Sequence, residues 1–309
     1  MSKAKKIISV VIPCFNEQDN IPLIYQRIKE VIKGTKYNFE IIFIDNGSSD
    51  KTYQVIKFFV KKDKIVKGLK LSRNFGPEAS VWAGIVETKG DAVVTIECDL
   101  QSPPELIPAL IKRWEEGFDS VVGVYGKIDD YLPMIWLRKL YYFVLGEISQ
   151  IEIPANATGF GLMDRKVVEA LKTIPEKNRF YRGLKAWLGF KTTKLKYKRE
   201  QRKKGKSSYN LINYLKHAEK GVFGFSYLLL DAIFYGSLAY LVINILLLLI
   251  YVFYSLSISH FSLTISIIFT ISTLSSIQFV AIGIIGKYVQ VISEESKSRP
   301  VYIVEEQIP

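Results

Sequence analysis

Cysteine is scarce in this chain of 309 residues, which contains only Cys14 and Cys98. Two cysteines exclude the disulfide-dense scaffold of small secreted proteins, and their separation matches no common zinc-ligand spacing. We therefore expect two reduced thiols in a cytosolic domain, while the sequence leaves a bridge between them open. The apolar run 7–13 behind the basic N-terminus is short and leads into polar residues, so we expect no signal peptide.

Charge is almost absent between positions 227 and 286, where Asp231 is the single formal charge in the segment. A spanning helix needs about 20 apolar residues, so the segment predicts two spans, at 228–254 and 263–286. The link 255–262 lacks Lys and Arg, whereas both flanks are basic. Because basic flanks stay cytoplasmic, we expect an integral membrane protein whose first half lies in the cytoplasm. The alternative is one long buried hairpin in a soluble protein.

The formal net charge is +12, from 42 Lys and Arg against 30 Asp and Glu. Such an excess suits nucleic acid, a membrane surface or an anionic substrate. No nucleic-acid-binding module is recognisable, and the basic stretch 199–206 lies close to the first predicted span. We therefore expect membrane lipids and phosphorylated molecules as partners, and no nucleic acid.

Short β-branched runs alternate with helical patterns through the first half of the chain. The expected strands are 7–13, 39–44, 66–71, 92–96, 120–124, 159–163 and, at an edge, 191–200. The expected helices are 21–33, 52–61, 77–87, 104–116 and 165–172, the last capped by Asp164. This alternation predicts an α/β fold with a Rossmann-like, mainly parallel sheet.

These patterns divide the chain into four predicted regions. They are a cytoplasmic α/β domain at 1–208, an amphipathic juxtamembrane helix at 209–226, a two-helix transmembrane hairpin at 227–287 and a cytoplasmic C-terminal tail at 288–309.

Polar residues follow each of the first four strands. The groups are Asn16-Glu17, the segment 45–50, Ser72-Arg73-Asn74 and the segment 97–101. One such loop would be an ordinary turn. Ligands of parallel sheets bind beyond the carboxyl ends of the strands, so four polar loops on one edge predict a binding site.

The loop after the fourth strand carries Glu97, Asp99 and Gln101 at alternate positions. Hard oxygen ligands spaced in this way can hold one divalent cation, and Mg²⁺ or Mn²⁺ prefers carboxylates together with phosphate oxygens. A turn before a helix is the equally simple alternative.

Four motifs together resemble family 2 glycosyltransferases of the GT-A fold. They are segments 9–17, 45–50, 72–76 and 99–105. The nearest group is the polyisoprenyl-phosphate glycosyltransferases, which includes dolichol-phosphate mannose synthases and bacterial bactoprenol glucosyltransferases. The resemblance covers nearly the whole chain, including the two predicted spans.

The resemblance implies roles for residues that match the motifs of the family. Asp45 would contact the base or ribose of a nucleotide sugar, and Asp99 would bind the metal with Gln101 and Glu97. The residues implied in nucleotide-sugar binding are Pro13, Phe15, Glu17, Asp45, Arg73, Glu97, Asp99, Arg202 and Ser207.

Further matches concern the acceptor and the sugar. Arg138, with Lys127 and Arg202, would hold the phosphate of the lipid acceptor. Asp164 matches an Asp near the sugar, which with Asp99 and Arg138 completes the expected catalytic set. Asp164 could instead orient the sugar or only cap its helix.

The sequence also departs from the family pattern. Glu97 replaces the first Asp of an Asp-x-Asp motif, and Asn46 follows Asp45 where a second Asp is commoner. The segment 157–161 stands where relatives often carry Gly-Asp-Phe-Arg. Tyr125 occupies the place of an Arg in many relatives, and Lys127 could replace it.

The resemblance implies transfer of a sugar from a nucleotide sugar to polyprenyl phosphate at the cytoplasmic face of a bacterial plasma membrane. We expect UDP-glucose as the donor, with GDP-mannose as the alternative, a single inverting displacement and a homo-oligomer. A processive polysaccharide synthase would carry a Gln-x-x-Arg-Trp signature, which segment 201–204 lacks. A catalytically inactive membrane scaffold of the same fold stays open.

Overall fold

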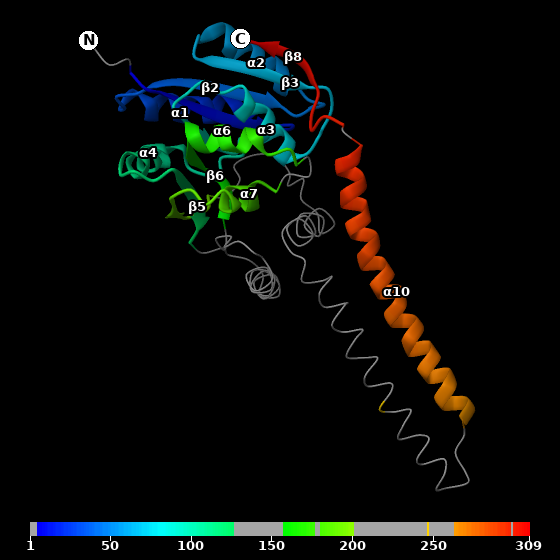
Figure 1. Cartoon of the computed structure of the whole chain (residues 1–309). Helices are drawn as coiled ribbons and strands as arrows, with labels where there is room; N and C mark the ends of the chain where they lie inside the picture. Colours follow the sequence, from blue (N-terminus) through cyan, green and yellow to red (C-terminus); the bar gives the residue numbers. More distant parts are fainter. Residues whose placement is uncertain (1–4, 127–156, 177–179, 201–245, 247–262, 298) are drawn as a thin grey trace. The chain divides into compact units, whose positions relative to one another are not determined.

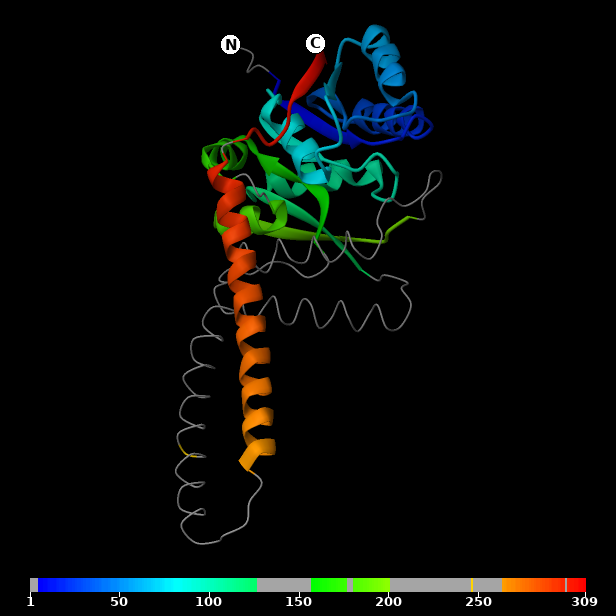
Figure 2. The ribbon, with the colours of Figure 1, turned by 90° about the vertical axis from the view of Figure 1, so that its right-hand side faces the viewer.

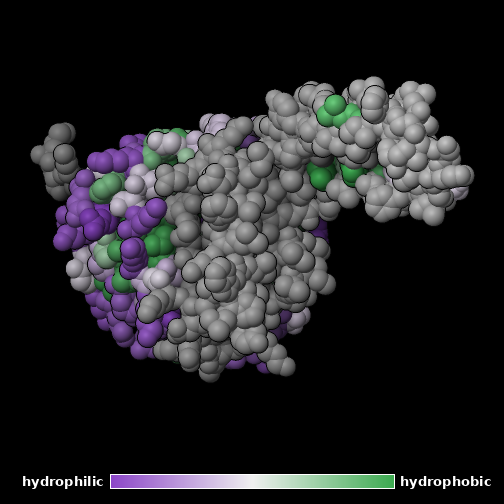
Figure 3. Space-filling model, turned by 90° about the horizontal axis from the view of Figure 1, so that it is seen from below, coloured by the Kyte–Doolittle hydropathy of each residue, from purple (hydrophilic) through white to green (hydrophobic). Residues whose placement is uncertain are grey.

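The computed structural model describes residues 5–126, 157–176, 180–200, 246, 263–297 and 299–309. The chain divides into two compact units. One comprises 1–147, 151–221 and 299–309, and the other comprises 148–150 and 222–298. The described surface seen in Figure 3 is mostly hydrophilic, with small hydrophobic patches between the polar side chains.

The first unit is built on one sheet of eight strands (Figure 1). They are β1 (Ile7–Cys14), β2 (Asn38–Asp45), β3 (Val66–Leu71), β4 (Ala92–Thr95), β5 (Ser120–Tyr125), β6 (Ala157–Asp164), β7 (Thr192–Tyr197) and β8 (Val304–Ile308). Their order across the sheet is β7-β5-β6-β4-β1-β2-β3-β8. The first four strands are parallel, whereas β6 runs antiparallel to both β4 and β5, and β8 runs antiparallel to β3. The predicted α/β, mainly parallel sheet is therefore confirmed.

Helices cover both faces of this sheet. They are α1 (Ile21–Lys33), α2 (Thr52–Lys62), α3 (Pro77–Val86), the 3-10 turn η1 (Pro104–Leu106), α4 (Ile107–Glu115), α6 (Arg165–Thr173) and α7 (Tyr181–Trp187). The stripe of Ile21, Ile24 and Ile28 on α1 is fully buried, as the helical spacing of these residues predicts. The same core contains buried residues of α2 and α4 together with alternate residues of β1 and β2.

The opposite face of the sheet carries α3. A Cβ atom at Gly84 would lie 2.4 Å from Val11 and 2.6 Å from Ile44, so only glycine lets this helix approach so closely. Strand β1 is thus covered on both faces, which explains why its sequence is almost continuously apolar. The two helical layers hold the parallel strands in register and fix where their carboxyl ends lie.

The described part of the second unit is dominated by α10 (Leu263–Ser296), one continuous helix (Figure 2). It contains the predicted second span and continues past the predicted boundary at 287. Among the described residues, no helix meets the combined length and apolarity that crossing a membrane requires. The predicted juxtamembrane helix 209–226 and first span 228–254 lie outside the described residues, apart from Leu246.

The end of the chain returns to the first unit. Strand β8 pairs with β3 from Gly68 to Leu71, and the backbone N–H of Ser72 donates to the carbonyl of Ile303 over 3.0 Å. The region predicted as a C-terminal tail therefore completes one edge of the sheet.

Candidate active site

The carboxyl ends of β1 and β2 lie side by side, because Cys14 pairs with Asp45 in a parallel register. The loops that follow are joined by hydrogen bonds. The backbone N–H of Asn16 donates to Ser48 Oγ over 2.9 Å, and that of Ser49 donates to Asn16 Oδ1 over 2.9 Å. Two of the four predicted polar loops thus form one continuous edge.

The loop after β3 is joined to the same edge through Asn46. Its Nδ2 donates to Asn74 Oδ1 and to the carbonyl of Gly76, both over 3.1 Å, and its Oδ1 accepts from the backbone N–H of Phe75 over 3.0 Å. A carboxylate could not donate to two acceptors. The departure from the family's second Asp therefore has a structural reason, since Asn46 ties the loops after β2 and β3 together.

Gly47 brings Arg73 to this edge. Its φ is +70°, and a Cβ atom there would lie 2.4 Å from the backbone of Arg73, so the turn requires glycine on both counts. The exposed Arg73 guanidinium lies over the ring of Phe75, 4.2 Å from its centroid. The structure therefore places Arg73 beside the Asp45 loop, as the sequence predicts.

Asp45 is completely buried at the end of β2. Its Oδ1 accepts from the backbone N–H of Ser48 over 3.0 Å, and within the described residues its buried Oδ2 has no hydrogen-bond partner. Burial raises the pKa of this carboxyl group, against the hydrogen bonds from Ser48. Asp45 thus has one acceptor oxygen that no described group satisfies.

The residues at the end of β1 and directly after it lie near Asp45, because Cys14 pairs with Asp45. Glu17 is buried, and its Oε2 accepts from Asn20 Nδ2 over 2.5 Å, while Pro13 and Phe15 are half-buried. Both cysteines are buried, and in the structure neither takes part in a disulfide. Burial, followed by contact with the Cys98 thiol, raises the pKa of Cys14 well above its ordinary value.

The loop after β4 carries the second acidic group of the site. Burial and the nearby charge of Asp99 raise the pKa of Glu97. Glu97 Oε2 accepts from Ser102 Oγ over 3.0 Å. Ser102 Oγ is also hydrogen-bonded to the Tyr197 hydroxyl at 2.8 Å, and that hydroxyl donates to Thr158 Oγ1 over 3.1 Å. Buried hydroxyl groups thus hold the Glu97 carboxylate beside Asp99.

The predicted metal ligands are only partly assembled. Asp99 Oδ1 accepts from the backbone N–H of Gln101 over 3.1 Å, but Gln101 Oε1 accepts from the guanidinium of Arg199, with the Nε contact at 3.1 Å. The Gln101 side chain is therefore engaged elsewhere. In the parts of the chain that the structure describes, no group of three or more His, Cys, Asp or Glu forms a metal site.

Tyr125 lies beside the same acidic group. Burial and then the charge of Glu97 raise its pKa to about 12, and the guanidinium of Arg199 lies 5.2 Å from the centroid of its ring. A cation therefore stands next to the position where many relatives carry an Arg, although it comes from the segment after β7.

Asp164 lies at the opposite edge of the sheet. It pairs with Ala92 at the start of β4, whereas Glu97 and Asp99 follow the other end of that strand. Its Oδ1 accepts from the backbone N–H of Lys166 over 2.9 Å and its Oδ2 accepts from Trp114 Nε1 over 2.7 Å. The structure therefore places Asp164 away from Glu97 and Asp99, and its predicted role as the cap of α6 is confirmed.

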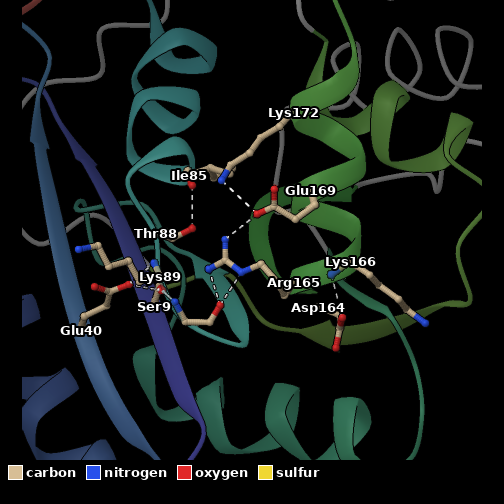
Figure 4. Close-up of polar contacts among 11 residues, drawn as sticks. Ser9, Glu40, Ile85, Thr88, Lys89, Asp164, Arg165, Lys166, Glu169 and Lys172 are labelled. Atoms are coloured by element: carbon tan, nitrogen blue, oxygen red, sulfur yellow. Dashed lines mark hydrogen bonds and ion pairs between the residues drawn. The ribbon is translucent and has the colours of Figure 1, made fainter.

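Figure 4 shows the surroundings of this cap. Arg165 follows Asp164, and its guanidinium donates to the carbonyl of Gly90 and forms an ion pair with Glu169 at 3.2 Å. These contacts fasten α6 to the loop before β4, so this edge of the sheet is a structural network.

Four predicted site residues lie outside the described part of the chain: Lys127, Arg138, Arg202 and Ser207. Conversely, the structure brings two residues of α7 toward Glu97 that the sequence did not single out. Arg182 and Lys185 both interact electrostatically with Glu97. The signal that could have indicated them is a pair of basic residues spaced three apart within the otherwise apolar segment 180–188.

Comparisons with known proteins found several similar chains. A structure of glucosyl-3-phosphoglycerate synthase from Mycobacterium tuberculosis in complex with Mn²⁺, UDP-glucose and phosphoglyceric acid is 18% identical, with a TM-score of 0.47 over 71% of this chain and 78% of that chain. An uncharacterized glycosyltransferase of Synechocystis sp. is 37% identical over 310 residues, 96% of this chain and 94% of the relative. The bactoprenol glucosyl transferase of Shigella phage SfX is 35% identical over 303 residues, 96% of this chain and 98% of the relative. The family model described as Glycosyl transferase family 2 matches residues 9–172. The chain therefore belongs to glycosyltransferase family 2 and is a glycosyltransferase with the GT-A fold of that family.

Proposed function

We propose that the protein transfers glucose from UDP-glucose to a polyprenyl phosphate at the cytoplasmic face of a membrane. The observation that carries the proposal is the position of two acidic groups on one edge of the sheet. Asp45 ends β2, and Glu97 and Asp99 follow β4, with β1 between these two strands. The relatives named bactoprenol glucosyl transferases match nearly the whole chain, which supports the choice of sugar and acceptor.

The donor nucleotide would bind at the β2 end of this edge. The unsatisfied Asp45 Oδ2 can accept a hydrogen bond from a ribose hydroxyl or a base N–H, neither of which the described protein groups supply. Pro13, Phe15 and Glu17 border the same loop and would line the pocket, while Arg73 offers a cation to the diphosphate. This placement directs the sugar toward Glu97 and Asp99.

The chemistry of these two carboxylates fits a divalent cation. They are hard oxygen ligands two positions apart, and burial, followed by the charge of Asp99, raises the pKa of Glu97. We propose that Asp99 and Glu97 hold Mg²⁺ or Mn²⁺, which when bound would neutralise negative charge on the diphosphate. The hydroxyl of Ser102 keeps the Glu97 carboxylate oriented.

The acceptor needs positioning more than activation. A phosphate monoester carries most of its second negative charge at neutral pH, since its second pKa is about 6. An acceptor oxygen can therefore attack the anomeric carbon directly, and the bond from that carbon to the diphosphate breaks with inversion. No protein group has to remove a proton. Lys127, Arg138 and Arg202 are proposed to hold the acceptor phosphate.

The lipid acceptor requires a membrane location. We propose that segments 228–254 and 263–286 span the bilayer and that the first unit lies on the cytoplasmic side. The absence of Lys, Arg and Glu from 227 to 286, together with basic flanks, supports this arrangement. The basic stretch 199–206 would approach the anionic headgroups, where each basic residue contributes about 1 kcal/mol.

A donor screen tests the proposal. Membranes containing the full chain are incubated with polyprenyl phosphate and radiolabelled UDP-glucose, GDP-mannose or other nucleotide sugars, and label is measured in the lipid phase. We expect label from UDP-glucose, its loss in EDTA and a decrease of about 100-fold or more for Asp99→Ala. Glu169→Ala, which alters an exposed carboxylate on α6, serves as the control.

Two results would contradict the proposal. Label that enters the lipid only from another donor would exclude UDP-glucose. Equal transfer by Asp99→Ala and the unsubstituted protein would exclude the metal site at Asp99.

A further inference from the structure

A pocket of about 150 Å³ lies beneath α7, away from the Asp45 loop. Arg182 and Lys185 line it from the helix, Val122 and Ala157 line it from β5 and β6, and Phe190 lines it from the segment before β7. Because Arg182 and Lys185 are three positions apart on a helix, their side chains lie on one face. The pocket thus combines two cations with an apolar wall.

Lys185 is only 8% exposed. Within the residues that the structure describes, its ammonium group has neither a hydrogen bond nor an ion pair, and the carboxylates of Glu78 and Glu97 act on it only at longer range. Burial and then repulsion from Arg182 lower its pKa to about 8. Burying a cation without a close counter-charge lowers the stability of the folded state. An anion bound next to Lys185 would offset this cost, and the described part of the protein places none there.

The pocket lies near the reaction centre. Ala157 begins β6, and two positions later Gly159 lies against Glu97 Oε1. Ala157 also packs with Val122 and Val124 in a small apolar cluster on the same face of the sheet. An anion in this pocket would therefore have the acidic group on one side and a hydrophobic surface on the other.

We propose that Arg182 and Lys185 bind the phosphate group of the polyprenyl acceptor, whose first isoprene unit lies on Val122 and Ala157. This inference rests on the proposed function, because it concerns the acceptor of the same reaction, and it adds Arg182 and Lys185 to the cations proposed above for the acceptor phosphate. A phosphate attached to a hydrocarbon matches the pocket better than a sugar nucleotide does, since the nucleotide lacks an apolar group next to its phosphates. Arg182 can offer a fork of N–H donors and Lys185 a point charge.

Binding of farnesyl phosphate to the full chain tests this assignment without requiring turnover. Fluorescence of Trp187, which lies two residues from Lys185 and is 60% exposed, reports the titration. We expect Lys185→Met to weaken farnesyl phosphate binding about tenfold or more, whereas Lys185→Arg keeps most of the affinity. Lys194→Met, which removes an exposed lysine from β7, should bind as the unsubstituted protein does. Farnesol, which lacks the phosphate, should bind weakly to all four proteins.

Stability separates binding from a structural role. Because Met fills a similar volume without a charge, Lys185→Met should have a Tm at least as high as that of the unsubstituted protein. A variant that loses both stability and binding would show that Lys185 is structural, and the assignment would be withdrawn. Unchanged farnesyl phosphate affinity in a folded Lys185→Met protein would also overturn it.

Binding of UDP, the nucleotide part of the proposed donor, is the last measurement of this test. UDP affinity should be equal in the unsubstituted protein and in Lys185→Met. If UDP binding falls while farnesyl phosphate binding does not, the pocket holds the diphosphate of the donor and the acceptor assignment is wrong. If farnesyl phosphate binds through Lys185 but no label enters the lipid phase in the donor screen, the phosphate site stands and the proposed function fails.

Discussion

A Cβ atom at Gly159 would lie 2.6 Å from Glu97 Oε1. This distance is shorter than any contact that a carbon and a carboxylate oxygen tolerate, so the Glu97 side chain occupies the space that a side chain at position 159 would need. Two departures from the family pattern, the longer acid after β4 and the glycine in β6, are therefore complementary. One carboxylate fills the volume between the two strands.

This complementarity predicts that Gly159→Ala displaces the Glu97 carboxylate. We expect kcat/KM to fall about tenfold or more, because a small displacement of a group at the reaction centre lowers the rate strongly. Glu97→Asp shortens the acid and makes room, so the double variant Glu97→Asp, Gly159→Ala should be more active than Gly159→Ala alone. The measurement is a double-mutant cycle on transfer rate. Gly34→Ala, where the nearest atom to an added Cβ is 3.9 Å away, is the control. Strictly additive effects would show that the two positions do not interact.

Asp164 should affect stability and not the transfer rate, because it pairs with Ala92 at the start of β4, away from Glu97 and Asp99. Asp164→Ala removes the cap of α6 and the acceptor for Trp114 Nε1, and should lower the free energy of unfolding by about 1–2 kcal/mol. The transfer rate of the folded protein should be unchanged. Asp164→Asn keeps a capping oxygen and should lose less stability. A large fall in kcat with unaltered stability would return Asp164 to the catalytic set.

Much of the fold could be predicted because local patterns and tertiary structure agree in the first four βα units. The strand 66–71 and the helix 21–33 were predicted to the residue, since the first is bounded by polar turns and the second carries a regular apolar stripe. The polar loops after these strands follow from the rule that parallel strands present their carboxyl ends on one edge.

The remainder depends on long-range pairing that local patterns do not encode. Strand β6 enters the sheet antiparallel between β4 and β5, which carries Asp164 away from the carboxyl ends of the parallel strands. Strand β8 pairs with β3 across more than 200 positions of sequence, and its exposed acidic residues Glu305 and Glu306 gave no strand signal. Lys185 was missed because charge alone does not reveal burial.

The pH dependence of stability follows from Glu40, a buried residue of β2 at the edge opposite the candidate active site. Burial by itself would raise the pKa of its carboxyl group. The carboxylate accepts hydrogen bonds from Lys67, Ser9 and the backbone N–H of Lys89, at 2.6 to 2.7 Å (Figure 4 shows Ser9, Glu40 and Lys89). These hydrogen bonds lower its pKa below the ordinary value of 4.5. A carboxyl group whose pKa is depressed by folding stabilises the folded state above its unfolded pKa and loses that contribution as the pH falls through the folded value. We therefore expect Glu40→Gln to lower the free energy of unfolding by about 1–3 kcal/mol at pH 7, with the difference from the unsubstituted protein shrinking below pH 4.5.

Urea unfolding of the full chain between about pH 3 and about pH 8, a range that brackets the transition, measures this difference. The control is Glu30→Gln, at an exposed position of α1, whose free energy of unfolding should stay within about 0.5 kcal/mol of that of the unsubstituted protein throughout. A difference that stays constant across the whole pH range would show that Glu40 acts through packing and not through its charge.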